Sequence, residues 1–343
     1  MSITIRDVAQ RAGVSVTTVS RALNGTGPVS DEARRRVEAA SAELRYTPNS
    51  TARSLITRRT ATFGVVLPDL YGEFFSEVIR GMDPLARQRG YHLLLSSSHD
   101  DQREIEFALG AMRGRVDGLV VMSPNVSGPA LAASLPADLP AVLLNCETDG
   151  APFSALSVDN FGGAQEMVRH LAATGHRRIG MVRGADANFD ARERHRGYRA
   201  ALAEAGLPGA DGRWEAAGDF TEAGGWLAAL ELTRRPEPPT AVFCANDSMA
   251  VGAMSALRGA GLRVPDDVAV TGFDDIPIAR YLSPALTSVH VDVQRLGARA
   301  VEMLCDALAA PRAPPLQEIV PTRLVIRRSC GAEGGPAAHH LPT

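Results

Sequence analysis

Amide and carboxylate side chains follow apolar runs at four places in the chain, where they could hydrogen-bond to a polyhydroxylated ligand. They are Asn145 after residues 141–144, Asp159 after 155–158, Asn246-Asp247 after 241–244, and Asp274-Asp275 shortly after 268–271. Each also has a simpler interpretation as a helix cap or loop residue, and we favour that interpretation for Asp247 and Asp275. Four strand ends that bring such side chains to one region nevertheless predict a site that binds a polyol.

Two further residues suit that site. Arg194 is the expected cationic partner, and Phe220 offers a face that could stack on a sugar ring, although core packing explains Phe220 about equally well.

The carboxylates could in principle act as general acid and base, but the sequence contains no GxSxG, phosphate-loop or HExxH motif. All 36 basic residues are arginine, which excludes lysine chemistry. We therefore expect a binding protein and not an enzyme, with no cofactor and no metal.

The first sixty residues point to a different chemistry. They hold ten arginines against five acids, a net charge of +5, whereas the remainder carries −8. A basic head on an acidic body is typical of a polyanion-binding module joined to a second domain, although a solvated arginine-rich surface would have the same composition.

Capping signals divide this basic segment into three short helices. Thr4, Ser15 and Ser30 stand at expected helix N-termini, and Gly13 and Gly25 stand just after the ends of the first two helices. Two short helices joined by a glycine-containing turn are typical of a helix-turn-helix unit. In such a unit the N-terminal residues of the second helix lie at the base edges of the major groove.

The second helix, expected at residues 16–23, is therefore the candidate for reading DNA. Val16 and Thr17 would lie at the base edges, and Arg21, one turn later, is long enough to reach a guanine. Short polar residues around it suit phosphate contacts, although Ser15 and Asn24 are also explained as caps. The residues expected to contact DNA in this unit are Ser15, Val16, Thr17, Thr18, Arg21, Asn24 and Ser30.

A longer pattern makes the assignment specific. The pieces that carry it are IRDVA at 5–9, AGVS at 12–15, TVSRALN at 18–24, Val29-Ser30, Arg34, Val37, Ala40, Leu44, Tyr46, Pro48-Asn49 and ARSL at 52–55. This gap-free pattern resembles the headpiece of the LacI/GalR family of bacterial transcription regulators. The resemblance implies a DNA-binding headpiece at residues 1–48 and a hinge at 49–60.

The hinge has its own expected role. Asn49 can cap a fourth helix at 50–58, which is too short to persist alone in water. In the family the corresponding helix orders on operator DNA and pairs with its dimer mate in the minor groove, and the family's leucine wedge falls on Leu55. Ala52, one turn earlier, is small enough for close approach. The alternative is a plain linker with Leu55 packed on the body.

The remaining residues alternate strand-like and helix-like segments in two series. The expected strands are 63–67, 91–95, 118–121, 141–144 and 155–158, and then 178–182, 241–244 and 268–271. Continuous apolar strands that alternate with helices predict parallel sheets covered on both faces. The expected fold is thus an N-terminal all-α helix-turn-helix headpiece followed by an α/β body of two doubly wound parallel-sheet lobes, with a ligand cleft between the lobes.

The body resembles the regulatory half of the same family, which is similar to a periplasmic sugar-binding protein. The pieces that match include VDN at 158–160, GHRRI at 175–179, Arg194 with Gly197-Tyr198, ANDS at 245–248, GFDD at 272–275 and PTRL at 321–324. The resemblance implies effector contacts by Phe74, Asn145, Arg194, Phe220, Asn246 and Asp274. It also implies a first lobe of about 61–160 plus 290–322 and a second of about 161–289 plus 323–330.

These features predict a cytoplasmic transcriptional regulator, expected to be a repressor, that binds a pseudo-palindromic double-stranded operator as a homodimer. Its effector is expected to be a small carbohydrate, either a sugar or a sugar phosphate. The alternative is a solute-binding protein without DNA function, against which the basic headpiece and the missing signal segment count. No apolar run approaches a membrane span, and the four scattered cysteines fit a reducing compartment. The Gly/Pro-rich end at 331–343 lacks leucine heptads; His339-His340 could pair on a metal, but we expect an unstructured tail.

Overall fold

The structure is a computed structural model of the chain, and it describes residues 3–25, 27–46, 59–99, 101–126, 128–136, 139–148 and 152–332. The chain divides into two compact units, residues 1–60 and 61–343. Each unit is described by itself.

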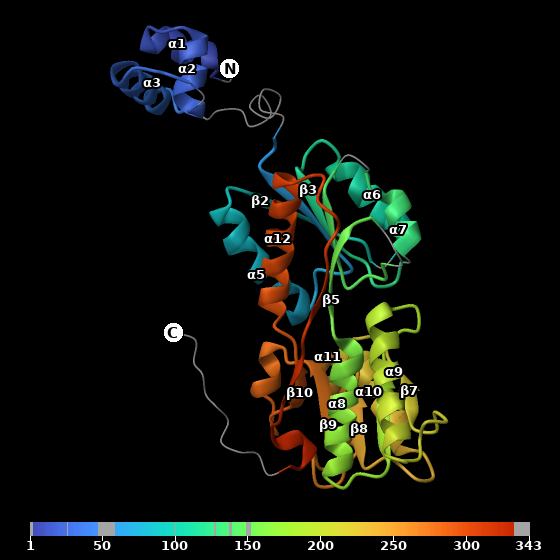
Figure 1. Ribbon diagram of the computed structural model, residues 1–343. Coiled ribbons are helices and arrows are strands. Elements are labelled where there is room, and N and C mark those ends of the chain that lie inside the picture. Colours follow the sequence, from blue (N-terminus) through green and yellow to red (C-terminus); the bar gives the residue numbers. More distant parts are fainter. Residues whose placement is uncertain are drawn as a thin grey trace. The chain divides into compact units, whose positions relative to one another are not determined.

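The first unit contains the three predicted helices, α1 (Ile5–Ala12), α2 (Val16–Asn24) and α3 (Asp31–Glu43) (Figure 1). Its N-terminal cap is the expected box, because Thr4 donates its backbone N–H and its hydroxyl to Asp7 Oδ2, both at 2.8 Å. Gly13 ends α1 with φ 62°, a left-handed conformation that glycine adopts without steric cost. The local capping signals thus determine where these helices begin and end.

Three apolar side chains and three arginines hold the helices together. Val8, Val19 and Val37, one from each helix, are fully buried. Arg34 donates to the carbonyl oxygen of Ala22 at 3.2 Å, Arg36 donates to that of Gly13 at 3.1 Å, and Arg11 pairs with Glu43 at 2.7 Å. Part of the basic charge of this unit therefore serves its internal packing.

The second unit contains two six-stranded sheets, one in each lobe. The first sheet has the order β11-β5-β4-β3-β1-β2, and all its neighbouring strands are parallel. Its strands are β1 (Thr62–Leu67), β2 (His92–Ser97), β3 (Gly118–Met122), β4 (Ala141–Leu144), β5 (Ser154–Val158) and β11 (Gln317–Val320).

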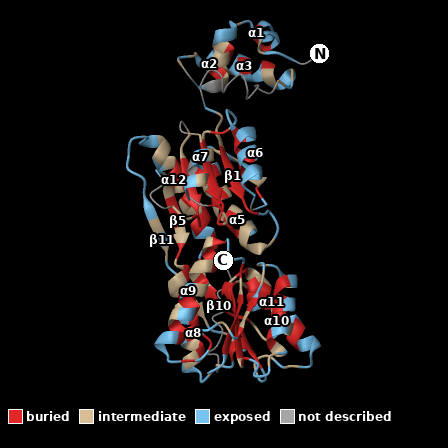
Figure 2. Ribbon diagram, turned by 90° about the vertical axis from the view of Figure 1, so that its right-hand side faces the viewer, coloured by how far each residue is buried: buried red, intermediate tan, exposed pale blue. Residues whose placement is uncertain are grey.

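Helices cover both faces of this sheet. Alternate strand residues point to opposite faces, so Val65 packs with α5 (Glu73–Gln88) and α12 (Val293–Ala309), whereas Val66 packs with α6 (Gln102–Met112) and α7 (Gly128–Ser134). Figure 2 shows the resulting buried strands between half-exposed helices.

The second sheet has the order β12-β10-β9-β8-β6-β7, and only β12 is antiparallel to its neighbour. Its strands are β6 (Ile179–Arg183), β7 (Glu215–Ala217), β8 (Ala241–Cys244), β9 (Ala269–Asp274), β10 (Thr287–His290) and β12 (Arg323–Val325). The pairs α8 (Asn160–Ala173) with α9 (Phe189–Glu204) and α10 (Glu222–Thr233) with α11 (Asp247–Gly259) pack beside it (Figure 1). Two short 3₁₀ turns, η1 (Pro277–Arg280) and η2 (Arg328–Cys330), complete the lobe.

The chain passes between the lobes three times. After β5 it enters the second lobe at α8, after β10 it returns to the first lobe for α12 and β11, and it ends in the second lobe with β12. All eight predicted strands are present. The four that the sequence did not indicate, β7, β10, β11 and β12, are short and contain polar residues (EAA, TSVH, QEIV and RLV), so none forms a continuous apolar run.

Candidate functional site

The N-terminus of α2 presents an ordered polar turn and an exposed face. Ser15 Oγ accepts the backbone N–H of Thr18 at 3.1 Å, and the two hydroxyl oxygens lie 2.8 Å apart. Val16 is 40% exposed although it is apolar, and Thr17 and Arg21 are exposed beside it. These side chains are free to contact a ligand, because the opposite face of the helix supplies the core.

The other residues expected to contact DNA lie at helix ends or in the hinge. Ser30 is exposed and accepts the backbone N–H of Ala33 at 3.3 Å as the cap of α3. Asn24 is the last residue of α2. The hinge residues Asn49, Ala52 and Leu55 lie outside the residues that the structure describes.

A cavity of about 210 Å³ lies between the two lobes of the second unit. Its lining combines aromatic rings, carboxylates and amides, and includes Asp69, Tyr71, Phe74, Phe75, Met122 and Pro124 from the first lobe and Asn188, Asp190, Arg194, Phe220, Asn246 and Asp274 from the second. Mixed aromatic and hydrogen-bonding walls are suited to a ligand that has apolar faces and a polar rim.

Arg194 is the centre of this site. It is 3% exposed, lies with its guanidinium 3.8 Å from the centroid of the Phe273 ring, and donates to Asn160 Oδ1 (2.7 Å) and Asp274 Oδ1 (3.1 Å). A further donation goes to the backbone oxygen of Ala245. The guanidinium is thus held in one orientation before any ligand binds, which lowers the entropic cost of binding.

Two buried carboxylates share this arginine. Asp190 Oδ1 accepts the amide of Asn160 at 2.8 Å, and Asp274 accepts from Arg194 directly. Burial raises the pKa of both carboxyls to about 6, against the opposing effect of Arg194; the like charge of Asp190 raises the pKa of Asp274 further, and that of Glu193 raises the pKa of Asp190. Desolvation therefore dominates their titration.

Five of the six residues expected to contact an effector line the cavity. They are Phe74, Arg194, Phe220, Asn246 and Asp274. The sixth, Asn145, is fully buried, and its carboxamide oxygen accepts the backbone N–H of Val158 at 3.2 Å. It is not among the lining residues, because it ties two neighbouring strand ends together.

Phe220 is held rigidly at the cavity wall. It has a positive φ of 68°, and its ring fits over Gly184, where an added Cβ would lie 2.4 Å from the ring. Asn246 Nδ2 donates to the backbone oxygen of Phe220 at 3.0 Å. The ring is therefore packed against Gly184 and also lines the cavity, and stacking on a sugar ring stays a prediction.

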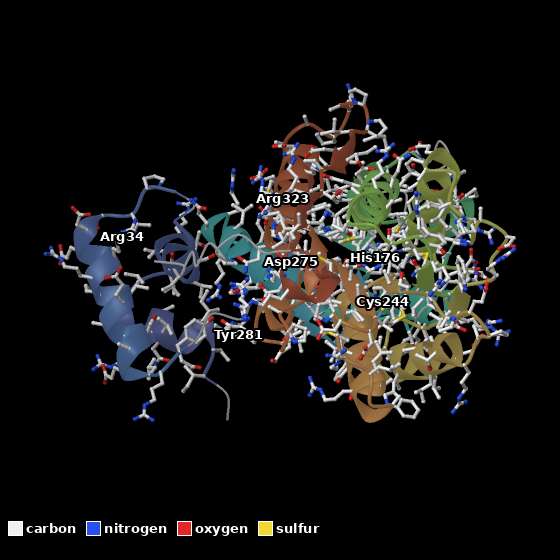
Figure 3. The ribbon with its side chains drawn as sticks, turned by 90° about the horizontal axis from the view of Figure 1, so that it is seen from below. Arg34, His176, Cys244, Asp275, Tyr281 and Arg323 are labelled. Atoms are coloured by element: carbon white, nitrogen blue, oxygen red, sulfur yellow. The ribbon has the colours of Figure 1, made fainter. Side chains whose placement is uncertain are left out.

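As expected, Asp247 and Asp275 are not among the cavity-lining residues, and Asp275 lies in a loop, whereas Asp247 is the first residue of α11 and the cap there is Asn246. Asp247 is fully buried and accepts from the Ser288 hydroxyl (2.6 Å) and the Ile276 backbone N–H (2.9 Å). Asp275, labelled in Figure 3, pairs with His290 (2.9 Å) and Arg327 (2.7 Å). Asp247, at the start of α11, and Asp275, just after β9, are thus bonded to residues farther along the chain, which a local pattern does not reveal.

Several lining residues were missed by sequence reasoning. Asn188 and Thr221 line the cavity, and they cap α9 and α10 through bonds of 3.0 Å to Ala191 N and Gly224 N. Asp190, in the first turn of α9, also lines it. The signal that could have found them is the cap pattern, because α9 and α10 also begin at the carboxyl edge of the sheet.

Several contacts between described residues join the lobes across the cleft. Arg192 on α9 pairs with Glu147 at 2.9 Å, the backbone N–H of Phe189 donates to the oxygen of Pro124 at 2.8 Å, and Glu73 accepts the backbone N–H of Ile278 at 2.9 Å. Each contact would break or shift if the lobes moved, so the cleft contents and the lobe arrangement are linked.

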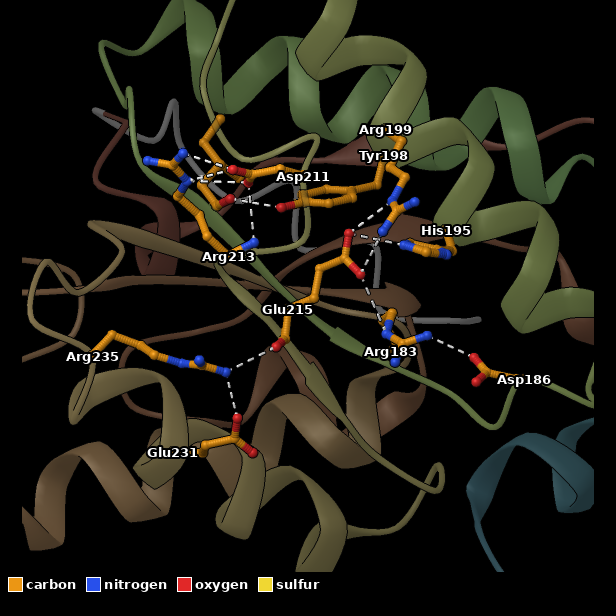
Figure 4. Close-up of polar contacts among 11 residues, drawn as sticks. Arg183, Asp186, His195, Tyr198, Arg199, Asp211, Arg213, Glu215, Glu231 and Arg235 are labelled. Carbon is orange, nitrogen blue, oxygen red and sulfur yellow. Dashed lines mark hydrogen bonds and ion pairs between the residues drawn. The ribbon is translucent and has the colours of Figure 1, made fainter.

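A separate charged cluster stabilises the edge of the second sheet (Figure 4). Glu215 on β7 pairs with Arg199 (2.9 Å), His195 (3.0 Å) and, more distantly, Arg183 (3.5 Å). Although burial opposes ionisation, the bonds from His195 and Arg199 lower the pKa of Glu215 to about 2. This cluster fastens a three-residue strand that could not persist by itself.

Other site types are absent from the described part of the chain. It contains no group of three or more His, Cys, Asp or Glu side chains able to hold a metal ion. All four cysteines are free thiols. Among the described helices none has the length and apolarity needed to cross a bilayer.

Comparison with known proteins agrees with both parts of this architecture. Residues 4–49 match the model of bacterial regulatory proteins of the lacI family, and residues 168–330 match that of the periplasmic binding protein-like domain. The chain is 38% identical over 330 residues to the HTH-type transcriptional repressor PurR of Yersinia pestis (strain Pestoides F), covering 95% of this chain and 96% of that protein.

Solved structures give the same result. A crystal structure of the lac repressor dimer bound to operator and the anti-inducer ONPF has a TM-score of 0.88 and 30% identity, covering 96% of this chain and 99% of the other. A complex of the transcriptional regulator CelR with cellobiose has a TM-score of 0.71 and 33% identity, covering 95% and 99%. With a headpiece and a two-lobed body that both match over nearly their full length, the chain belongs to the lacI family of bacterial transcriptional regulators.

Proposed function

We propose that this chain is a repressor whose α2 reads operator DNA and whose cleft binds a small carbohydrate that controls this binding. The observation that carries the proposal is the exposed face of Val16, Thr17 and Arg21 on a capped helix whose other face supplies the core. In this assignment Arg21 reaches a guanine, and Ser15, Thr18, Asn24 and Ser30 contact phosphates.

The hinge completes the DNA contact. Leu55 inserts into a central minor-groove step, and Asn49 and Ala52 support the helix that carries it. This part of the proposal rests on the sequence resemblance, since the hinge lies outside the described residues.

The effector site consists of Phe74, Arg194, Phe220, Asn246 and Asp274, with Asn145 behind them. The preoriented guanidinium and the aromatic walls support a polyol ligand, as does the complex of the related regulator CelR with cellobiose. A ligand that prefers one lobe arrangement shifts operator affinity only by its differential affinity for the two arrangements. The site thus acts by binding and not by catalysis, and the protein works in the cytoplasm.

Two copies act together on a pseudo-palindromic operator. The second unit exposes large apolar side chains, with Trp226 42%, Leu227 64% and Tyr281 75% exposed (Tyr281 is labelled in Figure 3). Single exposed apolar side chains are common on protein surfaces, so the support for a dimer comes from the related lac repressor, which was crystallised as a dimer on operator.

The test is selection of a preferred duplex from a random library by the purified full-length protein at moderate ionic strength, followed by titration of carbohydrates. We expect enrichment of a two-fold symmetric sequence, and a change in affinity for it when the effector is present. The matched variant Asp274→Ala should bind the same duplex without responding to the effector. Failure to enrich any sequence would overturn the proposal.

A further inference from the structure

The charge of the cleft indicates whether it favours a neutral, an anionic or a cationic ligand. The presence of one guanidinium does not decide this by itself. Among the described residues that line the cavity there are six carboxylates and a single guanidinium. The carboxylates are Asp69, Glu73, Asp190, Asp219, Glu222 and Asp274. The guanidinium, Arg194, is already engaged by Asn160, Asp274 and the backbone of residue 245. The field inside the cleft is therefore negative.

Helix N-termini are where an α/β fold ordinarily binds a phosphate, because their free N–H groups and dipoles favour an anion. Four helices begin at this cleft, and each carries a carboxylate in its first turn. The pairs are Glu73 on α5, Asp190 on α9, Glu222 on α10 and Asp247 on α11. Three of these carboxylates, Glu73, Asp190 and Glu222, line the cavity, and a unit negative charge outweighs the roughly half-unit positive charge of a helix end. Asp247 does not line it, and burial raises the pKa of this carboxyl well above its usual value.

Some of the N–H groups at three of these helix starts are also occupied. Asn188, Thr221 and Asn246 each accept one first-turn N–H group, of α9, α10 and α11 respectively, at 2.9–3.0 Å, whereas α5 begins at Gly72 without a side-chain cap. At α9, α10 and α11 the protein's own oxygen atoms thus compete with a phosphate for the helix start.

Aromatic rings reinforce the selection. Tyr71, Phe74, Phe75 and Phe220 line the same cavity, and Phe74 and Phe75 meet edge to face with centroids 5.6 Å apart. Ring faces attract cations as well as the apolar faces of sugars. A protonated amine can therefore gain from both the rings and the carboxylates, whereas a phosphate gains from neither.

We propose that the cleft selects its carbohydrate ligand by charge, binding an amine-bearing polyol more tightly than the neutral parent sugar, and rejecting the phosphorylated form. This inference rests on the proposed function of the cleft as the effector site. It assigns the effector to the non-phosphorylated carbohydrates and names an amino sugar as the favoured class.

The test uses matched sets of probes on the full-length protein. Each set contains a neutral hexose, its 2-amino analogue and its 6-phosphate (glucose, galactose and mannose series), titrated by calorimetry near neutral pH. We expect Kd to rise by about tenfold or more from amine to neutral sugar and again from neutral sugar to phosphate, and the gaps to shrink at high salt. A flat or reversed order, or the absence of amines among the compounds that bind, overturns the proposal.

A pair of variants separates the cleft field from the overall charge of the protein. Glu222→Gln removes one carboxylate from the cleft and should reduce the amine preference by about threefold or more. Glu231→Gln removes an equal charge from the same helix outside the cavity lining and should leave the preference unchanged; equal effects of both changes would also contradict the proposal. Operator binding is measured on the same preparations, so that failure of the charge selection can be told from failure of the proposed function. A chain that binds its operator and responds to a sugar phosphate refutes only the charge selection.

Discussion

Replacing Asp274 by asparagine should stabilise the free protein at neutral pH while removing its response to effector. Burial raises the pKa of Asp274 from 3.8 to about 6. Because the folded chain binds this proton more tightly than the unfolded chain, the stabilising contribution of the group is complete below pH 3.8. It is lost as the pH rises through 6. At pH 7.5 the ionised, buried carboxylate therefore carries its full penalty.

The size of the effect follows from the shift. Two pKa units correspond to about 3 kcal/mol of unfolding free energy, or roughly 5–10 °C in the midpoint of a lobe of this size. Asparagine keeps an oxygen that can accept from Arg194, which is now bonded at 3.1 Å, so the substitution removes charge with little change of shape. The extra stability of Asp274→Asn over the parent should decrease steadily as the pH falls from 7.5 to 5.

The measurement is thermal unfolding of Asp274→Asn and the parent between pH 5 and pH 7.5, followed by fluorescence. The matched control is Asp211→Asn, because Asp211 is exposed and its bonds from Arg213 lower its pKa, which places its titration below this window. A variant that is less stable than the parent at pH 7.5, or a gain that is equal at both ends of the window, would show that burial of this charge is not costly.

Three other perturbations test separate parts of the molecule. Arg21→Ala should weaken operator binding by about 1–3 kcal/mol with effector binding unchanged; retained site preference in a gel-shift assay would refute the groove assignment. Leu55→Ala should weaken specific binding and reduce DNA bending, and unchanged bending by fluorescence energy transfer would count against the wedge. Glu215→Gln should lower the thermal midpoint at neutral pH by roughly 3–5 °C. Because the pKa of Glu215 is lowered to about 2, the parent's advantage should be full above pH 4.5 and fade on acidification from there towards pH 2. If Glu231→Gln lowered the thermal midpoint by as much, the stabilising role of Glu215 would be contradicted.

Local sequence rules accounted for much of the fold. The capping box of Thr4 and Asp7, the Ser15 cap and the left-handed Gly13 depend on residues within four positions of each other, so a short window contains all the relevant interactions. The eight predicted strands likewise show their signal within a short window, because each centres on a run of mostly apolar residues. The short strands β7 and β12 carry no such signal, because pairing with distant strands stabilises them.

The candidate site was predictable only in part. Arg194, Asn246 and Asp274 were found because strand ends converge at one edge of a parallel sheet and because the resemblance names those positions. Asn145 shares that strand-end signal, yet it is buried beside Val158 and is absent from the cavity lining. A strand end specifies the edge at which a residue lies but not the direction of its side chain.

The order of modules, the helix boundaries of the headpiece and the alternation that makes two parallel sheets can be derived from the amino-acid sequence, since these follow from spacing and capping between near neighbours. That Arg194 is shared by partners 34 and 80 residues away along the chain is apparent only in the folded protein. The same holds for the four helix starts with their own carboxylates that surround one cavity. The charge of the cleft depends on side chains from distant segments that come together only after the chain has passed between the lobes. A local sequence pattern therefore cannot predict it.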